Sequence, residues 1–418
     1  MRVFKFGGAS VRDAKSVANV HSIIAKFNTE PLIVVVSAMG KTTNKLEGLV
    51  NAYFDGSDTS AFMEDLRNCH GEIVKELFGD ASTPVIDDIN NTLVEVEWAL
   101  DDPEGLDRHF QYDQIVSIGE MLSTKIISAY LKFKGLENEW VDARDLIRTD
   151  NNYQDAKIEW DTTREMTNST IDKALKKSNV IVTQGFIGGT SENFTTTLGR
   201  EGSDFTAAIL AYCTNASDVT IWKDVPGVLN ADPKFYEDTV LIPEMSYYDA
   251  MELAYFGTSV IHPKTIKPLQ NADIPLYVKS FVDPSAAGTI ISNKENEKKI
   301  PSFIVKSNQV LVSIVPRDYS FVGEGHFTNI FSVLSSLRIK TNCMQNSAVS
   351  FMFSTENNAA KLTELKSQLS SDYELSFNED AQLVTVRYFD EPTLEMLTKN
   401  KDILLEHRTA TTAQLVVK

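Results

Sequence analysis

Short, continuous apolar runs alternate along the chain with longer amphipathic stretches. The runs 32–36 (LIVVV), 180–182 (VIV) and 275–278 (PLYV) show no alternation with polar residues, which is typical of strands covered on both faces. Between 115 and 129, apolar side chains recur at helical spacing and predict one helix with an apolar stripe. This pattern predicts an α/β sandwich.

The pattern changes near residue 300. Residues 284–288 (PSAAG) and the charged run 294–299 are the best linker candidates, so we expect one domain over 1–295 and another over 301–418. The second region predicts the following elements: a strand at 310–315, a helix at 327–337, strands near Ile339 and Val349, and a shorter set at 383–386, 394–397, 403–405 and 415–417. This indicates a small α+β region with a weak internal repeat.

Composition narrows the class of protein. With 418 residues and 42% hydrophobic residues, the chain is long enough for two or three domains. A formal net charge of -18 argues against a nucleic-acid partner. The three cysteines are far apart, and the sequence shows neither a signal peptide nor an apolar run long enough to cross a bilayer. We therefore expect a soluble, cytoplasmic protein without a membrane partner or a protein-bound metal.

Two glycine-rich segments carry the candidate chemistry. Residues 5–10 (KFGGAS) follow an apolar run, so Gly7 and Gly8 fall where a buried strand ends and their amides can face an anion, with Lys5 beside it. Residues 197–204 (TLGREGSD) offer Arg200 as a planar fork for a carboxylate and Ser203 as the cap of a helix over 205–210. Together they predict a nucleotide site.

Three other motifs are look-alikes. The Gly40-Lys41-Thr42 tripeptide lacks the earlier glycine of a Walker phosphate loop, because Val35 stands there. The dinucleotide fingerprint around 323–325 lacks its third glycine. His262 beside a proline is more often structural than catalytic, so hydrolase chemistry is unsupported.

Glu120 lies off the apolar stripe of the helix predicted over 115–129. It is free to face a pocket, although helix statistics alone favour a solvated surface glutamate.

Seven segments, all in the same order as in the family, resemble the aspartate kinases of the amino-acid kinase superfamily. They are 5–10 (KFGGAS), 36–44 (VSAMGKTTN), 117–120 (SIGE), 183–186 (TQGF), 198–204 (LGREGSD), 224–228 (DVPGV) and 256–263 (FGTSVIHP). The likeness implies a three-layer αβα sandwich of the amino-acid kinase type, followed by ferredoxin-like ACT regulatory domains. The chain is similar to the monofunctional form, without a homoserine dehydrogenase domain.

The resemblance implies ATP-dependent phosphorylation of the side-chain carboxylate of L-aspartate, with Mg²⁺ bridging phosphate oxygens, on the route to lysine, threonine and methionine. Lys5 would span the transferring phosphoryl group and the acceptor, and Asp204 would fix its ammonium. Arg200 would hold the α-carboxylate of the substrate, and Glu120 its α-ammonium, which reverses the surface interpretation of Glu120. The expected hydroxyl donors are Ser37, Thr43 and Ser203.

Nucleotide contacts are also implied by the resemblance. Besides Lys5, Gly7 and Gly8, the matching positions are Lys223, Asp224, Leu229, Lys234 and Ser259. Ser259 replaces a frequent lysine, and Leu229 a frequent tyrosine. Lys223 stands where threonine is common, and Glu201 where glycine is common.

The C-terminal region departs further from the family. The regulatory positions implied are Phe327, Thr341 and Asn342, and Asn342 stands where lysine-inhibited relatives carry an acidic residue. The second ACT unit lacks its closing helix and strand in the sequence. We therefore expect a weak response to lysine, with an amino-acid effector at this region still open. Because ACT units pair across chains, we also expect a homodimer or a higher homo-oligomer.

Two alternatives remain open at this point. A kinase for another small acid, such as glutamate or N-acetylglutamate, would share the fold and the glycine-rich loops. A catalytically inactive amino-acid sensor would use the ACT region alone, although the set Lys5, Glu120, Arg200 and Asp204 argues against it.

Overall fold

The computed structural model describes residues 1–101, 107–257, 261–296 and 298–418. The chain forms two compact units. Unit 1 comprises Met1–Val228, Leu241–Met251 and Val260–Glu295, and unit 2 comprises Leu229–Val240, Glu252–Ser259 and Asn296–Lys418. Two segments of unit 2 thus come from within the predicted first domain, and the boundaries given by the sequence stay predictions.

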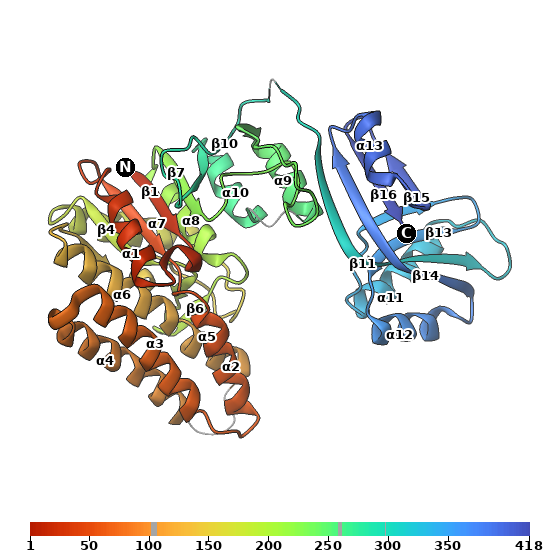
Figure 1. Cartoon of the computed structure of the whole chain (residues 1–418). Coiled ribbons are helices and arrows are strands. Elements are labelled where there is room, and N and C mark those ends of the chain that lie inside the picture. Colours follow the sequence, from red (N-terminus) through yellow and green to blue (C-terminus); the bar gives the residue numbers. More distant parts are fainter. Residues whose placement is uncertain (102–106, 258–260, 297) are drawn as a thin grey trace. The chain divides into compact units, whose positions relative to one another are not determined.

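Unit 1 is built on one large sheet (Figure 1). Its described strands are, in spatial order, β3 Glu139–Val141, β4 Val180–Gln184, β2 Leu32–Val36, β1 Arg2–Phe6, β7 Asp218–Lys223, β9 Leu276–Ser280, β10 Thr289–Ser292 and β8 Glu244–Ser246. Neighbouring strands are parallel except for β9 and β10. A separate hairpin pairs β5 Ile187–Gly189 with β6 Thr195–Thr197.

The central strands confirm the prediction from apolar runs, because β2 and β4 are buried at every position. The strand β9 differs from the expectation. Its residues alternate between buried and half-buried, so one face of β9 is less completely covered than the faces of β2 and β4.

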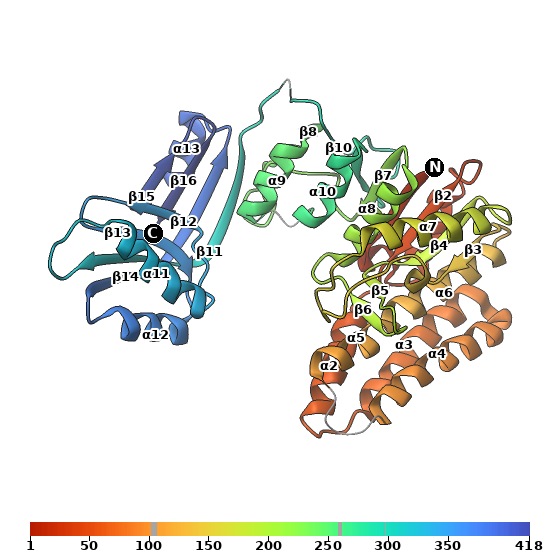
Figure 2. The ribbon, with the colours of Figure 1, turned by 180° about the vertical axis from the view of Figure 1, so that it is seen from behind.

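Helices cover both faces of the sheet, which confirms the predicted three-layer α/β architecture. On one face, Phe4, Phe6 and Val34 share a hydrophobic core with α1, α3, α4 and α6, and on the other α7 and α8 pack on the strands and α10 packs on α8 (Figure 2). The helices are α1 Ala14–Ile24, α2 Thr42–Phe54, α3 Ser60–Phe78, α4 Thr83–Asp101, α5 Arg108–Val116, α6 Ile118–Phe133, α7 Trp160–Leu175, α8 Gly202–Thr214, α9 Tyr247–Phe256 and α10 Pro263–Asn271, with 3-10 turns η1 Gly8–Val11, η2 Gly79–Ala81 and η3 Ala143–Asp145.

The single helix predicted over 115–129 is wrong in one respect. The helix is interrupted at Ser117, so that α5 ends at Val116 and α6 begins at Ile118. The break places Glu120 in the first turn of α6. The helix dipole favours a negative charge in this turn.

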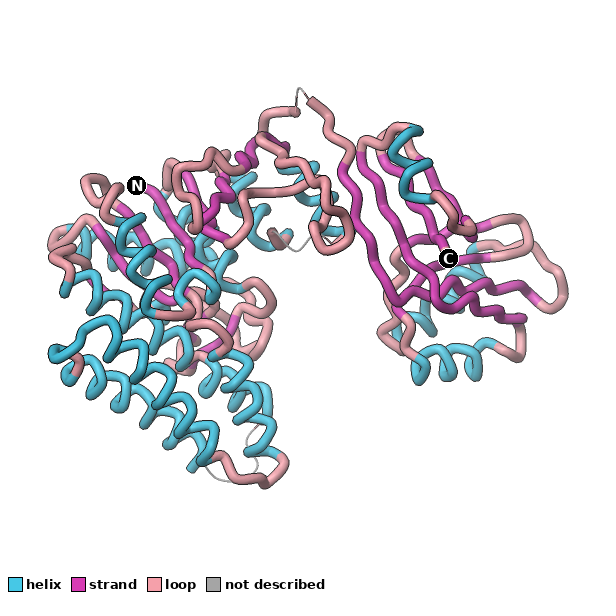
Figure 3. Tube along the Cα trace, in the orientation of Figure 1, coloured by secondary structure: helices cyan, strands magenta, loops and turns pink. Residues whose placement is uncertain are grey.

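Unit 2 contains a second sheet (Figure 3). All its neighbouring strands are antiparallel. Its described strands are, in spatial order, β12 Cys343–Asn346, β13 Phe351–Glu356, β11 Ser302–Pro316, β14 Tyr373–Arg387, β16 Thr412–Val417 and β15 Ile403–Arg408. The helices of this region are α11 Glu324–Ser336, α12 Ala359–Leu369 and α13 Glu391–Thr398. This α+β architecture is consistent with the predicted ACT domains.

The two longest strands of this sheet, β11 and β14, extend through both of its halves. The second part of β11 lies beside β13 and carries Val310, Val312 and Ile314 into a core with α11 and α12. The first part, Ser302 to Lys306, pairs with Leu383 to Arg387 in β14.

The start of β11 corrects the expectation that the second half lacks its closing strand. Residues 302–306 complete a four-stranded arrangement with β14, β16 and β15. The described chain after α13 contains no further helix. Instead, the ring of Tyr236, from the segment 229–240, lies 4.5 Å from that of Phe303 in the core of this half. The start of β11 therefore supplies the fourth strand of this half, and the segment 229–240 contributes to the core that a closing helix would otherwise cover.

Candidate active site

The predicted site residues of unit 1 gather where its parallel strands end. The carboxyl ends of β1, β2, β4 and β7 lie at one edge of the sheet, which is where open α/β sheets bind ligands. Backbone hydrogen bonds tie the loops together: the amide of Ser37 donates to Phe6 O at 3.0 Å, and that of Gly40 to Gly8 O at 3.1 Å. Distant segments thus form one compact edge.

Two glycines allow these loops to approach. A Cβ on Gly8 would lie 2.8 Å from the carbonyl oxygen of Ala38. A Cβ on Gly185 would lie 2.4 Å from the Cβ of Ser203. Both distances are shorter than real contacts, so a larger residue at either position would push the loops apart.

Lys5 and Asp204 form a buried ion pair at this edge. Lys5 Nζ lies 2.7 Å from Asp204 Oδ1, and Lys223 Nζ lies 3.5 Å from Asp204 Oδ2. The Asp204 side chain is fully buried and that of Lys5 is 9% exposed. Burial alone would raise the pKa of Asp204, but the two lysines outweigh it and hold the pKa below its ordinary value. One carboxylate therefore fixes two ammonium groups, leaving a local excess of positive charge.

Glu120 is buried, which contradicts the surface interpretation and agrees with the pocket-facing one. Its residue is 3% exposed, and its Oε2 has no hydrogen-bond partner within the described chain. Burial raises the pKa of Glu120 to about 8, although the Ala38 backbone and Lys5 act in the opposite direction. An unsatisfied buried carboxyl of this kind is suited to receiving a cation.

The start of α8 differs from the predicted cap. Glu201, not Ser203, is the N-cap residue, with a left-handed backbone (φ 55°) and no side-chain hydrogen bond to the helix. Ser203 lies inside the first turn and is buried against Gly185. Arg200, just before the helix, is exposed. The guanidinium is thus available to an anionic ligand, whereas the amides of Gly202 and Asp204 already donate to Gly199 O at 3.0 Å and to Glu201 O at 3.1 Å.

The two other predicted hydroxyl residues lie on the neighbouring loop. Ser37 follows β2 and is half-buried, and its carbonyl accepts a hydrogen bond of 2.7 Å from Ser123 Oγ. Thr43 lies in the first turn of α2 and is also half-buried. Their roles stay predictions.

Sequence analysis missed Asp113, on α5. Its carboxylate accepts hydrogen bonds from Thr197 N (2.8 Å), Thr197 Oγ1 (2.7 Å) and Gln154 N (3.0 Å). Burial raises the pKa of Asp113 to about 6 against these hydrogen bonds. Asp113 therefore anchors the base of the segment that carries Arg200. A helical aspartate gives no sign of burial in the sequence, so no local pattern could have found it.

The predicted nucleotide residues are placed in different parts of the chain. Lys223 ends β7 and Asp224 follows it, exposed. Leu229 and Lys234 belong to unit 2, and Ser259 lies outside the described residues. These assignments stay predictions.

The predicted regulatory residues lie in unit 2. Phe327, on α11, packs against the core of the first half of the sheet. Asn342 precedes β12, next to the half-buried Thr341. Asn342 Oδ1 accepts a hydrogen bond from Lys306 Nζ at 3.1 Å, and its Nδ2 donates to Gln309 Oε1 at 2.8 Å. The amide is thus already engaged within the chain.

Comparison of the sequence with known proteins identifies its family. The sequence matches the amino acid kinase family over residues 1–280. It is 31% identical to lysine-sensitive aspartokinase 3 of Escherichia coli over 86% of this chain and 79% of that protein. It is 33% identical to aspartokinase 1, chloroplastic, of Arabidopsis thaliana over 83% of this chain, but spans only 62% of that relative's length.

Solved structures agree over the whole chain. Escherichia coli aspartokinase III, in complex with lysine and aspartate, superposes with a TM-score of 0.82 at 26% identity and covers 100% of this chain and 96% of its own. The same enzyme in complex with aspartate and ADP gives a TM-score of 0.81. The fold and the site define a small-molecule kinase of the amino acid kinase family. Within that family, the chain belongs to the aspartokinases.

Proposed function

We propose that the protein transfers the γ-phosphoryl group of ATP to the side-chain carboxylate of L-aspartate, giving 4-phospho-L-aspartate and ADP. The observation that carries this proposal is the buried cluster of Lys5, Lys223 and Asp204, together with the buried carboxyl of Glu120, whose Oε2 has no hydrogen-bond partner within the described chain. The related Escherichia coli enzyme has been solved with aspartate and ADP, which supports both substrates.

The chemistry suits a site without a general base. The acceptor carboxylate has a reference pKa of about 3.9 and is ionised at neutral pH. One of its oxygens attacks the γ-phosphorus, and the bond between that phosphorus and the bridging oxygen breaks, so that ADP leaves with the electron pair. The barrier comes from bringing two anions together, and the ammonium of Lys5, fixed by Asp204, offsets that repulsion.

Mg²⁺ belongs to the proposal as part of the nucleotide complex. No cluster of three metal-ligating side chains occurs in the ranges that the structure describes. In kinases, Mg²⁺ is usually bound through one or two carboxylates and the phosphates of the nucleotide. Bound there, it would neutralise phosphate charge.

Substrate selectivity follows from two opposite charges. Arg200 offers a bidentate fork for the α-carboxylate, and Glu120 offers a buried partner for the α-ammonium. Because the pKa of Glu120 is about 8 in the free protein, the group is largely protonated at pH 7. We infer that binding of the substrate ammonium expels this proton.

A direct test uses ATP consumption with the product trapped as its hydroxamate. We expect turnover with L-aspartate, and little with L-glutamate or N-acetyl-L-glutamate. Arg200→Lys keeps the charge but loses the planar fork, so it should raise the KM for aspartate far more than the KM for ATP. Turnover of N-acetyl-L-glutamate instead of L-aspartate would refute the assignment, because that substrate has no ammonium for Glu120.

We further propose a homo-oligomer that responds weakly to lysine and acts in the cytoplasm. The Escherichia coli relative is described as lysine-sensitive, whereas here Asn342 is neutral and bonded to Lys306. Calorimetric titration with lysine tests the effector assignment, and micromolar binding would contradict it.

No helix in the described ranges has the length and apolar character needed to cross a membrane.

A further inference from the structure

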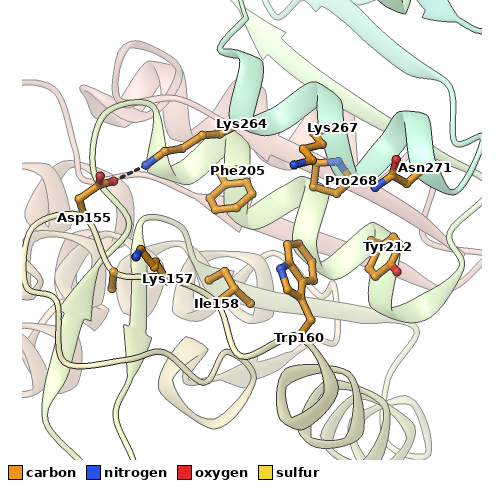
Figure 4. A pocket seen from close by; sticks show the side chains of 11 residues that line it. Asp155, Lys157, Ile158, Trp160, Phe205, Tyr212, Lys264, Lys267, Pro268 and Asn271 are labelled. Carbon is orange, nitrogen blue, oxygen red and sulfur yellow. Dashed lines mark hydrogen bonds and ion pairs between the residues drawn. The ribbon is translucent and has the colours of Figure 1, made fainter.

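Unit 1 contains a cavity of about 680 Å³ beside the candidate site (Figure 4). It is open to solvent and is lined by the segment 155–158, the start of α7, one side of α8 and one side of α10. Cavities of roughly 300 to 1,000 Å³ are typical of small-molecule sites. Nothing in the proposed phosphoryl transfer uses it.

The floor of the cavity is aromatic. The Trp160 ring lies 5.3 Å from that of Tyr212 at 80°, and 6.4 Å from that of Phe205 at 72°. Trp160 is 37% exposed, whereas Phe205 is 9% exposed. A half-open indole between two edge-on rings offers a surface for a flat apolar group.

The rim is basic although the protein is acidic. Three lysines and one aspartate line the cavity, whereas the whole chain carries a formal charge of -18. Lys264 is paired with Asp155. Lys157 and Lys267 are exposed, and no ion pair of either ammonium occurs within the described chain. An anionic group on the ligand would therefore find two ammonium groups at hand.

The cavity wall touches the loop that carries Arg200. Lys264 Nζ donates to the carbonyl oxygen of Leu198 at 3.4 Å. A Cβ on Gly199 would lie 2.8 Å from Asp155 Oδ1. Phe205, on the floor, directly follows Asp204 of the buried ion pair. A ligand that draws on Lys264 or displaces Phe205 must therefore disturb the residues on either side of the substrate loop.

We propose that this cavity binds a planar aromatic carboxylate, whose ring lies on Trp160 and whose carboxylate meets Lys157 and Lys267, and that its binding alters the affinity for the acidic substrate. The second part rests on the proposed function. The first part concerns binding alone and stands independently of it.

Calorimetry with the full chain tests the binding. The probes are naphthalene-2-carboxylate and its neutral isostere naphthalene-2-carboxamide. We expect the carboxylate to bind more tightly, Trp160→Ala to weaken it by about three- to tenfold, and the double variant Lys157→Gln/Lys267→Gln to weaken it by about two- to fivefold for each lysine. Lys173→Gln, on the same helix as Trp160 but away from the cavity, is the matched control.

Three outcomes would overturn the binding proposal. They are equal affinity for the carboxylate and the amide, unchanged affinity in Trp160→Ala, and the absence of binding to a wild-type protein with normal thermal unfolding. Sedimentation of Trp160→Ala adds a fourth, because a smaller assembly would show that a second copy of the chain fills the cavity.

Steady-state kinetics tests the coupling. Saturating naphthalene-2-carboxylate should change the KM for L-aspartate by about threefold or more in wild type and leave it unchanged in Trp160→Ala, whose activity without the probe should be normal. An equal effect in both proteins would refute the coupling. If wild type fails to phosphorylate L-aspartate even without the probe, the proposed function fails while the calorimetric result stands.

Discussion

Each unit sequesters a lysine, but the two lysines meet different partners. In unit 1, Lys5 meets the carboxylate of the fully buried Asp204. In unit 2, the half-buried Lys306 meets the neutral amide of Asn342, and burial together with Lys340 lowers the pKa of Lys306. A buried ion pair is a costly way to stabilise a fold, so the burial of Lys5 and Asp204 together points to a role beyond stability. The contrast separates a site built for anionic substrates from a packing arrangement.

Helix starts differ within each unit in whether a side chain caps them. In unit 2, α12 and α13 are capped by the side chains of Asn358 and Asp390. In unit 1, α8 begins at Glu201 without any side-chain cap. A side-chain cap satisfies an amide of the first turn, whereas at α8 the amides of Gly202 and Asp204 donate to the backbone oxygens of Gly199 and Glu201. The helix that carries Asp204 shares its lack of a side-chain cap with α11 of unit 2, whose N-cap is Gly323.

The largest effect should come from breaking the charged pair of unit 1. Lys5→Ala and Asp204→Ala should each lower kcat by about a hundred- to a thousandfold or more. The kcat of the double variant should be no lower than that of the less active single variant, because the two residues act as a unit. Hydroxamate assays on all three measure this. Thermal unfolding must be followed alongside, because a buried charge left alone costs about 3 to 5 kcal/mol.

Lys306→Ala is the matched variant in unit 2 and should keep kcat within about twofold of wild type, as expected for a substitution outside the active site. Multiplicative losses for Lys5 and Asp204, or a catalytic loss for Lys306 equal to theirs, would remove the distinction between the two lysines.

The second effect concerns pH. Since burial raises the pKa of Glu120 from 4.5 to about 8, the folded free protein holds this proton where the unfolded chain has lost it. The contribution of Glu120 to stability is therefore full below pH 4.5 and is lost as the pH rises through 8. For the same reason, kcat/KM for aspartate should rise with pH up to about 8, by close to tenfold per pH unit where the protonated form dominates.

Calorimetry of aspartate binding in buffers of different ionisation enthalpy should reveal up to one proton released near pH 7. Glu120→Gln should remove this release. A release of protons that persists in Glu120→Gln would assign it to another group.

Sequence patterns captured the sheet of unit 1 better than its site. Continuous apolar runs suffice for β2 and β4, because burial on both faces leaves a local signature. The closing strand of unit 2 leaves none, since residues 302–306 pair with 383–387 some eighty positions later. Motifs predicted a pairing of Lys5 and Asp204, which the structure brings together. The N-cap at Glu201 and the anchoring by Asp113 depend on backbone conformation and tertiary packing.

The third prediction concerns a variant that gives Lys306 of unit 2 a carboxylate partner, as Lys5 has in unit 1. Asn342→Asp places a carboxylate beside Lys306, so it should form an internal ion pair and protect the β11 and β12 amides from hydrogen exchange by about 1 kcal/mol. The sequence alone predicts tighter lysine binding by this variant. The structure refines that expectation, because Lys306 competes for the new charge.

Only the double variant Asn342→Asp/Lys306→Met should gain substantial affinity for lysine in calorimetry. Equal gains in the single and the double variant would show that Lys306 does not occupy the carboxylate.

The smallest effect tests the backbone conformation at the start of α8. Glu201 holds φ at 55°, a conformation that costs a residue with a Cβ roughly 1 kcal/mol relative to glycine. Glu201→Gly should therefore raise the free energy of unfolding by about that amount in urea, and it also removes a negative charge beside Arg200. Asn215, the C-cap of the same helix at φ 49°, is the matched control, because asparagine tolerates this conformation and Asn215→Gly should gain less. A larger gain in the free energy of unfolding from Asn215→Gly than from Glu201→Gly would show that the backbone of Glu201 is not strained at the start of α8.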